Sequence, residues 1–251
     1  CEASIGAAAD HRFFDAARTW KNVWITNVMD STGLVAYIMV RSSRLPESVH
    51  MPEINELLQG FQRFRVKSFE PNREIFNRLA MQGQTPSTLL IGCSDSRVDP
   101  AILTDSAPGD LFVVRNVANL IPPYETGGRY HGTSAAVEFA VCNLQVRNII
   151  VLGHSHCGGI TALLDGYGEN DEGEGYIAPW VRIAAPARDE VLKRWPNASR
   201  EFKQRACERA GVRASLTNLM TFPFIRQRVE DGTLNLYGWY YDLENGELMQ
   251  Y

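Results

Sequence analysis

Two short stretches of this sequence contain residue types that bind metal ions. The first reads Cys93-Ser94-Asp95-Ser96-Arg97 and the second reads His154-Ser155-His156-Cys157-Gly158-Gly159. Cys93, His154 and Cys157 together offer two thiolates and one imidazole, a ligand set that suits zinc. Three protein ligands leave the fourth position of a tetrahedral ion free, which is typical of a catalytic metal site. The residue types therefore predict a catalytic zinc ion.

His156 is an alternative ligand, because it also lies next to Cys157. Neighbouring side chains in a turn diverge, whereas residues three apart can meet on one face where a chain enters a helix. We therefore predict that His154 and Cys157 bind the ion and that His156 is a solvated loop residue. His131 is predicted to be structural or exposed.

Asp95 and Arg97 follow Cys93 at spacings that place all three in one tight turn. A bidentate contact from the guanidinium would fix the carboxylate and keep it ionised. The carboxylate could then accept the proton of a zinc-bound hydroxide and direct the oxygen lone pair toward a substrate carbon. The alternative is an ordinary surface ion pair that contributes little to stability.

Apolar runs come directly before both stretches. Residues 88–92 and 148–153 are bounded by turn residues, which is typical of buried parallel strands. Because the carboxyl ends of parallel strands line the ligand crevice of an open α/β sheet, the two stretches can converge there. Residues 111–115 predict another strand, and residues 132–146 a helix. This alternation predicts an α/β fold with a mainly parallel central sheet flanked by helices.

The remaining sequence predicts further helices and a final pair of strands. Apolar residues recur at helical spacing over 54–66 and again after Pro71. Helical patterns interrupted by prolines cover 177–195 and 198–220, and strands with a turn between them are predicted at 234–241 and 248–251.

The first 50 residues show no sustained helical or strand period. We predict that 1–50 is an N-terminal extension of unknown role outside the catalytic fold, and that 51–251 is the catalytic domain. A targeting leader and a misassigned upstream start are the alternatives for residues 1–50. Mass spectrometry of the native protein would decide between them.

Composition and charge limit the classes of partner. The chain has 251 residues, of which 45% are hydrophobic and 22% charged, an ordinary globular composition. The net charge is −4 and no dense run of Lys and Arg occurs, so we expect neither a nucleic acid nor a membrane as a partner. The longest early apolar run, residues 34–40, is too short to span a bilayer. A small-molecule substrate is predicted.

The cysteines indicate a reducing compartment. Their odd number and irregular spacing do not form a disulfide framework. Two of them lie in motifs that need free thiolates, so we predict a cytoplasmic protein, with an organelle left open by residues 1–50. Cys142 and Cys207 fall in helical patterns and are predicted to be small, buried apolar residues.

The order of these motifs resembles that of the β-class carbonic anhydrases, zinc enzymes that interconvert carbon dioxide and bicarbonate. The sequence VVRNVANLIPPY at 113–124 lies between the two stretches and adds to the resemblance, which runs from about Met51 to the C-terminus. The resemblance implies Zn²⁺ as cofactor and attack of a zinc-bound hydroxide on carbon dioxide. It also implies a homo-oligomer, a dimer or an assembly of dimers, in which the N-terminal helices form a dimerisation arm.

Particular positions resemble the plant-type, open-site subclass. Gln84 matches a glutamine that can donate to a bicarbonate oxygen, and Leu90 stands where bicarbonate-regulated members have Trp. We therefore predict no bicarbonate effector pocket. Phe112, Val117 and Phe139 match the apolar lining of the substrate site, with ordinary core positions as the alternative.

The resemblance also implies a role for the second subunit and for Asp95. Active sites of the family lie at the dimer interface, so Gln84 and Phe139 are expected to serve the zinc of the other subunit. The Asp that matches Asp95 can bind zinc when its Arg releases it, which shuts the site. Arg115 matches an arginine present in both subclasses.

Other functions fit the residues less well or stay open. A cysteine-dependent phosphatase needs an arginine six residues after its cysteine, and Arg97 is too close to Cys93. A thioredoxin-like site needs two cysteines three apart, which the sequence lacks. Two alternatives stay open: a hydrolase of carbon disulfide or carbonyl sulfide, and a zinc-stabilised scaffold with Asp95 as a permanent fourth ligand.

Overall fold

A computed structural model describes residues 23–30, 33–40, 52–127, 131–167 and 175–251 of the chain. The chain divides into two compact units, Cys1–Ser68 and Phe69–Tyr251. The unit that carries the predicted site thus begins after the first predicted helix, whereas the sequence placed the start of the catalytic domain at residue 51.

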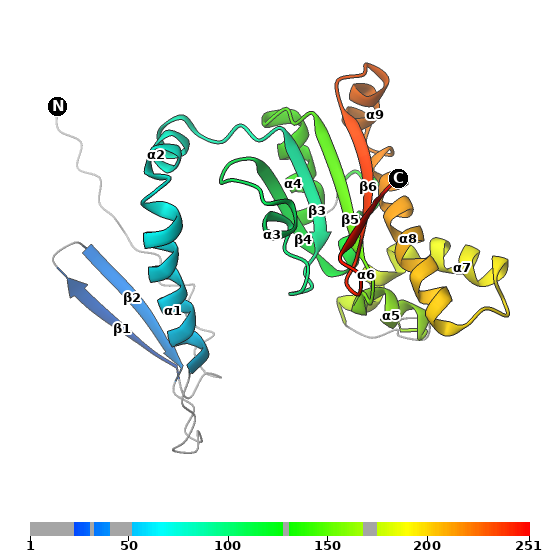
Figure 1. Ribbon diagram of the computed structural model, residues 1–251, viewed down its shortest axis with the longest axis horizontal. Helices are drawn as coiled ribbons and strands as arrows, with labels where there is room; N and C mark the ends of the chain where they lie inside the picture. Colours follow the sequence, from blue (N-terminus) through cyan, green and yellow to red (C-terminus); the bar gives the residue numbers. More distant parts are fainter. Residues whose placement is uncertain (1–22, 31–32, 41–51, 128–130, 168–174) are drawn as a thin grey trace, which may run out of the picture. The chain divides into compact units, whose positions relative to one another are not determined.

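The first unit contains a hairpin and a helix. Strands β1 (Val23–Asp30) and β2 (Gly33–Val40) pair antiparallel, and α1 (Pro52–Phe64) continues into a π-helical turn, η3 (Arg65–Phe69) (Figure 1). Residues 1–50 therefore contain two strands, although their sequence shows no sustained strand period. Both strands are rich in β-branched and aromatic residues, which favour strands, but they lack the strict apolar–polar alternation of a half-buried strand.

The apolar side chains of α1 recur at helical spacing, as predicted, but they are exposed in the single chain. The exposed apolar residues of this helix are Ile54, Leu57, Leu58, Phe61 and Phe64. The rings of Phe61 and Phe64 stack on each other, with centroids 6.3 Å apart. A contiguous apolar surface of this kind is typical of a site where another chain binds.

A five-stranded sheet forms the centre of the second unit. Its strand order is β4-β3-β5-β6-β7, with the first four strands parallel and β7 antiparallel to β6. The strands are β3 (Thr88–Cys93), β4 (Leu111–Asn116), β5 (Asn148–His154), β6 (Asn235–Asp242) and β7 (Glu247–Gln250). The predicted fold class, a mainly parallel sheet flanked by helices, is confirmed.

The helices of the second unit lie between these strands in the chain, except for α2, which precedes β3. They are α2 (Arg73–Gln82), α3 (Pro100–Thr104), α4 (Gly132–Glu138), α5 (Gly158–Leu164), α6 (Ile177–Val181), α7 (Ala185–Arg194), α8 (Arg200–Leu219) and α9 (Pro223–Glu230). Shorter turns are η4 (Val117–Asn119), η5 (Phe139–Asn143) and η6 (Arg182–Ala184). Within the described ranges, no helix has the length and apolarity needed to cross a membrane.

The helical pattern over residues 177–195 is interrupted, as predicted. It consists of α6, the 3-10 turn η6 and α7, and Pro186 lies in the first turn of α7. Helix α9 was not predicted. It begins at Pro223, and proline is favoured at the first position of a helix because its missing N–H needs no partner there.

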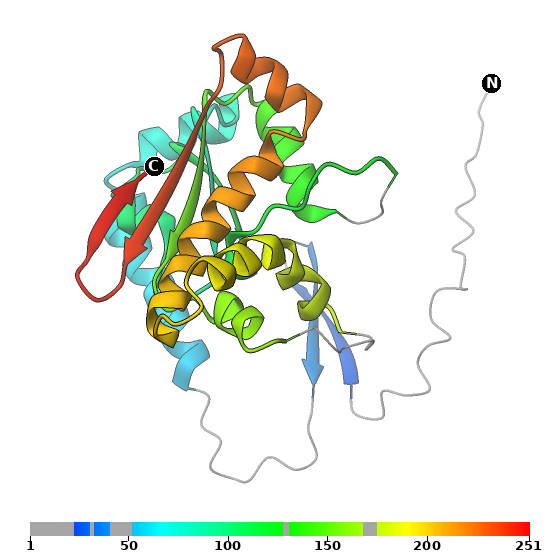
Figure 2. The same cartoon turned by 90° about the vertical axis from the view of Figure 1, so that its right-hand side faces the viewer.

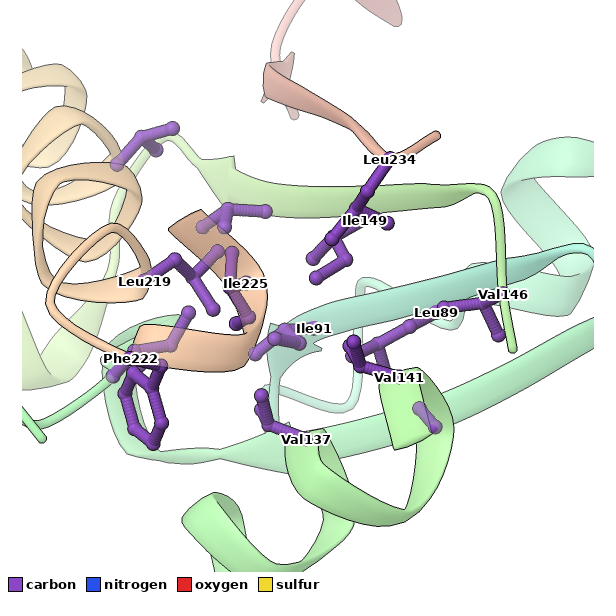
Figure 3. Close-up of a cluster of buried hydrophobic side chains, with 14 residues drawn as sticks. Leu89, Ile91, Val137, Val141, Val146, Ile149, Leu219, Phe222, Ile225 and Leu234 are labelled. Carbon is purple, nitrogen blue, oxygen red and sulfur yellow. The ribbon is translucent and has the colours of Figure 1, made fainter. Parts of the chain in front are cut away.

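Both faces of the sheet are apolar. On one face, Leu89, Ile91 and Ile149 pack against side chains of α4, η5, α8 and α9, including Val141 and Ile225 (Figure 3). On the opposite face, the neighbouring strand residues form a smaller cluster with a side chain of α3. Burial on both sides explains why the strand sequences are continuous apolar runs.

Helix α8 packs very closely on the sheet (Figure 2). A Cβ atom built on Gly153 of β5 would lie 2.5 Å from Val212 Cγ2, and one built on Gly238 of β6 would lie 3.0 Å from Leu216 Cδ1. Glycine on the strands therefore allows the helix to approach β5 and β6, whose carboxyl ends lie beside the predicted site.

We predict that Gly153→Ala lowers the free energy of unfolding by about 1–3 kcal/mol, because the added methyl group overpacks the contact with Val212. Urea denaturation followed by circular dichroism measures this change. Gly132→Ala is the matched control, since no atom of the described residues lies within 4 Å of a Cβ atom at Gly132. Equal stability of the two variants would contradict close packing at Gly153.

The chain order of the strands contains a topological switch point between β3 and β5. The connection from β3 leads to β4 on one side, and the chain then crosses to β5 on the other side of β3. Ligand crevices of open α/β sheets form at such a switch point, outside the carboxyl ends of the strands. Cys93 and His154 are the last residues of β3 and β5, so both lie at the carboxyl ends of the strands beside this switch point.

Candidate active site

Cys93, His154 and Cys157 come together as the sequence predicts. Each offers one ligand atom, these atoms all lie within 4.8 Å of one another, and all three residues are buried. Cys157 immediately precedes α5, so the turn after β5 brings it back beside His154. In a tetrahedral zinc site with these ligands, neighbouring ligand atoms are separated by about 3.3–3.8 Å. The three side chains therefore fit a zinc ion with one position left open.

The imidazole of His154 is held in the tautomer that a metal requires. Its Nδ1 lies 2.8 Å from the carbonyl oxygen of Ser155, so the N–H at Nδ1 donates and Nε2 carries the lone pair. Nε2 is buried and has no hydrogen-bond partner among the described residues. A buried unpaired acceptor is costly, and a metal ion at this position would satisfy it.

The two thiols influence each other strongly. Hydrogen bonding from Cys157 lowers the pKa of Cys93 to about 4, and the same contact raises the pKa of Cys157. Burial disfavours protonated His154, but contact with Cys93 outweighs burial and its pKa is raised. Without a metal, the pair therefore holds one thiolate and one thiol at neutral pH. A divalent cation would compensate the buried negative charge.

Asp95 and Arg97 form the predicted bidentate pair. Arg97 Nε donates to Asp95 Oδ1 at 2.9 Å, Nη2 donates to Oδ2 at 2.7 Å, and the Arg97 backbone N–H donates to Oδ1 at 3.0 Å. These hydrogen bonds hold the pKa of Asp95 well below its usual range, so it stays ionised. Asp95 Oδ2 also lies 4.0 Å from His154 Nε2, which places the carboxylate beside the ligand set.

Arg115 of β4 ties down the loop that carries this pair. Its Nε donates to the carbonyl of Cys93 at 2.9 Å and its Nη2 to the carbonyl of Asp95 at 2.7 Å. Its Nη1 donates at 3.1 Å to Asp99, which caps α3. This role of Arg115 was not predicted, since contacts with main-chain carbonyls leave no mark in a motif.

Glu208 of α8 fixes the other end of the ligand set, and the sequence analysis missed it. Its buried carboxylate accepts from the backbone N–H of Cys157 at 3.0 Å and from the hydroxyl of Tyr240 at 2.7 Å. Its neighbours Cys207 and Ala210 are also buried. A charged residue beside buried helix positions was the available signal, but its partners are distant in the sequence.

His156 lies outside the ligand set and in the loop, as predicted. Its backbone is left-handed, with φ of 57°, and its side chain is 42% exposed. The imidazole is nevertheless paired, because Nε2 lies 2.7 Å from Glu244 Oε1. Its carbonyl oxygen accepts from Arg97 Nη2 at 3.1 Å. The prediction for His131 is also confirmed, since this residue is exposed.

The predicted substrate residues lie in two places. Val117 lies next to the start of α5, the helix that directly follows Cys157, because a Cβ atom on Gly159 would be 2.8 Å from its Cγ1. Phe112 and Phe139 contact each other, with ring centroids 5.9 Å apart. Phe112 pairs with the second residue of β3 and so lies about 13 Å from the Cys93 end of the sheet. Gln84 is exposed and precedes the amino end of β3.

The cysteines outside the site differ from each other. Cys207 is buried, as predicted, and burial raises its pKa to about 11. Cys142 is exposed, so the prediction that it is buried is wrong. It lies in the π-helical turn η5 that follows α4, and this turn changes which positions face the core relative to a regular helix.

Comparisons with known proteins agree with this fold and site. A family model described as carbonic anhydrase matches residues 88–248. A carbonic anhydrase of Synechocystis sp. is 39% identical over 198 residues, which are 79% of this chain and 71% of that protein. The structure of the β-carbonic anhydrase CcaA superposes with a TM-score of 0.74 at 38% identity, over 80% of this chain and 88% of that chain.

A more distant structure shows the same fold. A structure described with two tetrameric β-carbonic anhydrases of the fungus Sordaria macrospora has a TM-score of 0.68 at 27% identity, over 79% of this chain and 96% of that chain. The fold is thus that of a β-class carbonic anhydrase. This chain belongs to the carbonic anhydrase family and is an enzyme of that class.

We predict that zinc binding to the metal-free protein releases protons near neutral pH. The pKa of Cys157 is raised, so its thiol is protonated in the free site and must lose its proton to bind the metal. Apparent zinc affinity should therefore rise with pH, by at least about one log unit per pH unit.

Calorimetry in buffers of different ionisation enthalpy measures the number of protons released. At least about one proton per zinc is expected. The Cys157→Ser variant is the control and should release fewer protons. Zinc binding without proton release in the unmodified chain would contradict the single shared thiol proton.

Proposed function

We propose that this chain catalyses the reversible hydration of carbon dioxide to bicarbonate with a zinc ion held by Cys93, His154 and Cys157. The observation that carries this proposal is the buried ligand set beside the Asp95–Arg97 pair, in which His154 Nε2 has no hydrogen-bond partner among the described residues. Membership of the carbonic anhydrase family supports the same reaction.

The charge of the ligand set determines how strongly a bound metal would lower the pKa of water. A bound zinc ion would act as a Lewis acid that lowers the pKa of water toward neutrality and so supplies a nucleophile. Two thiolates bring more negative charge to the site than neutral imidazoles do. Cys93 and Cys157 therefore weaken this lowering of the pKa, and a neighbouring group has to assist in supplying the nucleophile.

Asp95 is the group in position to assist. It is ionised because Arg97 donates to both of its oxygens, so it acts only as a hydrogen-bond acceptor. Accepting a hydrogen bond from the attacking water orients the lone pair of that oxygen toward the carbon of the substrate. Arg97 fixes the carboxylate and keeps it from taking up the proton permanently.

Carbon dioxide has no dipole, so contact with apolar side chains has to hold it. Val117 is the predicted lining residue that lies near the segment after Cys157 in its own chain. Phe112, Phe139 and Gln84 are placed toward the other end of the sheet, so we propose that they serve the metal site of a second subunit. A homo-oligomer built from dimers follows from this, and the tetrameric relatives from Sordaria macrospora support it.

We propose the remaining features from the sequence. The site is of the open subclass without a bicarbonate effector pocket, given Gln84 and Leu90. A cytoplasmic location fits the need for two free thiolates.

Stopped-flow measurement of carbon dioxide hydration, normalised to bound zinc, tests the proposed function. Turnover is expected at neutral and at alkaline pH. Cys93→Ser and His154→Ala should each lower turnover per protein chain by about a thousandfold, because each removes a ligand that holds the Lewis acid. Cys142→Ser, an exposed thiol outside the site, is the control and should leave turnover unchanged.

Two outcomes would contradict parts of this proposal. Turnover only at alkaline pH would mean that Asp95 occupies the open position at neutral pH. Fully zinc-loaded protein without turnover at either pH would exclude the hydratase, and hydrolysis of carbonyl sulfide would then be the assay to run on the same scaffold.

The apolar face of α1 provides a test of the oligomer. Leu57→Asp combined with Phe61→Asp should shift the sedimentation coefficient toward the monomer and lower turnover, because charges would replace exposed apolar side chains of the proposed arm. Gln59→Asp combined with Gln62→Asp adds the same charge to the same helix and is the control. An unchanged sedimentation coefficient for the first pair would exclude α1 from the interface.

A further inference from the structure

Asp95 lies close enough to the ligand set to become a fourth ligand itself. Its Oδ2 is 4.0 Å from His154 Nε2, the atom assigned to the metal. Carboxylate oxygens bind zinc readily, so a rotation of this side chain would bring an oxygen into the open position. Four protein ligands would leave no place for water or substrate. Some feature of the chain therefore has to hold this carboxylate back.

Arg97 holds the carboxylate, but Arg97 needs an anchor of its own. Its side chain is 51% exposed, and an exposed ion pair is easily exchanged for water. Beyond its contacts with Asp95, the guanidinium makes one hydrogen bond to another segment in the described part of the chain. That bond runs from Nη2 to the carbonyl oxygen of His156, at 3.1 Å.

The position of this carbonyl depends on an unfavourable backbone conformation. His156 has φ of 57°, in the left-handed region that residues with a Cβ atom seldom occupy. Such a conformation persists only where the surroundings enforce it. The imidazole supplies that restraint, because its Nε2 donates to Glu244 Oε1 at 2.7 Å.

Glu244 is in turn fixed by Arg205 of α8. Arg205 Nη2 donates to Glu244 Oε2 at 2.6 Å, and its Nη1 donates to Asp242 Oδ2 at 3.3 Å. Asp242 also accepts from the hydroxyl of Ser155 at 3.2 Å. The end of β6 and the turn that follows it thus form hydrogen bonds with Ser155 and His156, the two residues between the metal ligands His154 and Cys157.

We propose that His156, braced by Glu244 and Arg205, is a positioning residue for Asp95. Its carbonyl keeps Arg97 on the carboxylate, and Arg97 keeps the carboxylate out of the fourth metal position. Without the brace, His156 relaxes to an ordinary backbone conformation, Arg97 turns to solvent and Asp95 binds the metal. This role rests on the zinc site proposed above and adds residues from α8 and the β6–β7 turn to it.

Cobalt(II) in place of zinc provides a test that does not depend on turnover. Azide binds cobalt(II) at an open position and changes its visible absorption, so a titration reports whether that position is free. In Glu244→Ala, the affinity for azide should fall by about tenfold, and the spectrum without azide should change as a carboxylate replaces water. Glu247→Ala is the matched control, an exposed glutamate of the same hairpin, and should resemble the unmodified chain.

A double variant separates competition by Asp95 from general loosening of the site. Glu244→Ala combined with Asp95→Asn should bind azide as tightly as Asp95→Asn alone, because the competing carboxylate is gone. Azide affinity that is unchanged in Glu244→Ala, or that stays low in the double variant, would overturn the positioning role.

The thiolate-to-cobalt charge-transfer band distinguishes this result from failure of the metal site itself. The band is expected in the unmodified chain and in every variant above, since all keep both cysteines. Its presence together with unchanged azide affinity in Glu244→Ala would remove the role of His156 and leave the zinc site intact. Its absence from the unmodified chain would overturn the zinc site, and the positioning role with it.

Discussion

The burial of two thiols and an imidazole within 4.8 Å of one another is the constraint on which the rest of this structure depends. Removing such groups from water is costly unless each finds a partner. His154 Nε2 has none within the described part of the chain, and Cys93 and Cys157 share one proton, so the cluster is incomplete as a purely protein environment. A cation would complete it, and the chain around the cluster is held rigid by hydrogen bonds to its backbone.

That rigidity comes from two elements, one beside Cys93 and one beside Cys157. Arg115 of β4 holds the main chain of the Cys93 loop, and Glu208 of α8 holds the main chain at Cys157. Both contacts are made with backbone groups. They therefore fix the direction in which the ligand side chains project from the main chain, although neither Arg115 nor Glu208 contacts the metal position. Close packing of α8 on Gly153 is a condition for the second contact, because it brings Glu208 to the loop.

The ligand set, the Asp95–Arg97 pair and the parallel sheet could be predicted because each is encoded over short distances in the sequence. Apolar runs predict buried strands, and strand ends place the motifs. Glu208 and Glu244 could not be found in this way, since their partners Cys157 and His156 are remote in the sequence. The hairpin of β1 and β2 lacked alternation, and the π-helical turn at Cys142 broke the helical period.

The position of the apolar pair Phe112–Phe139 relative to the metal ligands decides whether one chain can form a complete substrate site. The Cys93 end of β3 holds the metal ligands, whereas Phe112 lies beside the opposite end of the same strand. One parallel sheet cannot bring its two ends to one point, so a single chain cannot place these aromatic rings over its own metal. If the rings line a substrate site, each site needs two chains, and metal binding and substrate binding then depend on different contacts. The exposed apolar face of α1 fits this division, because a contiguous exposed apolar surface is typical of a site where another chain binds.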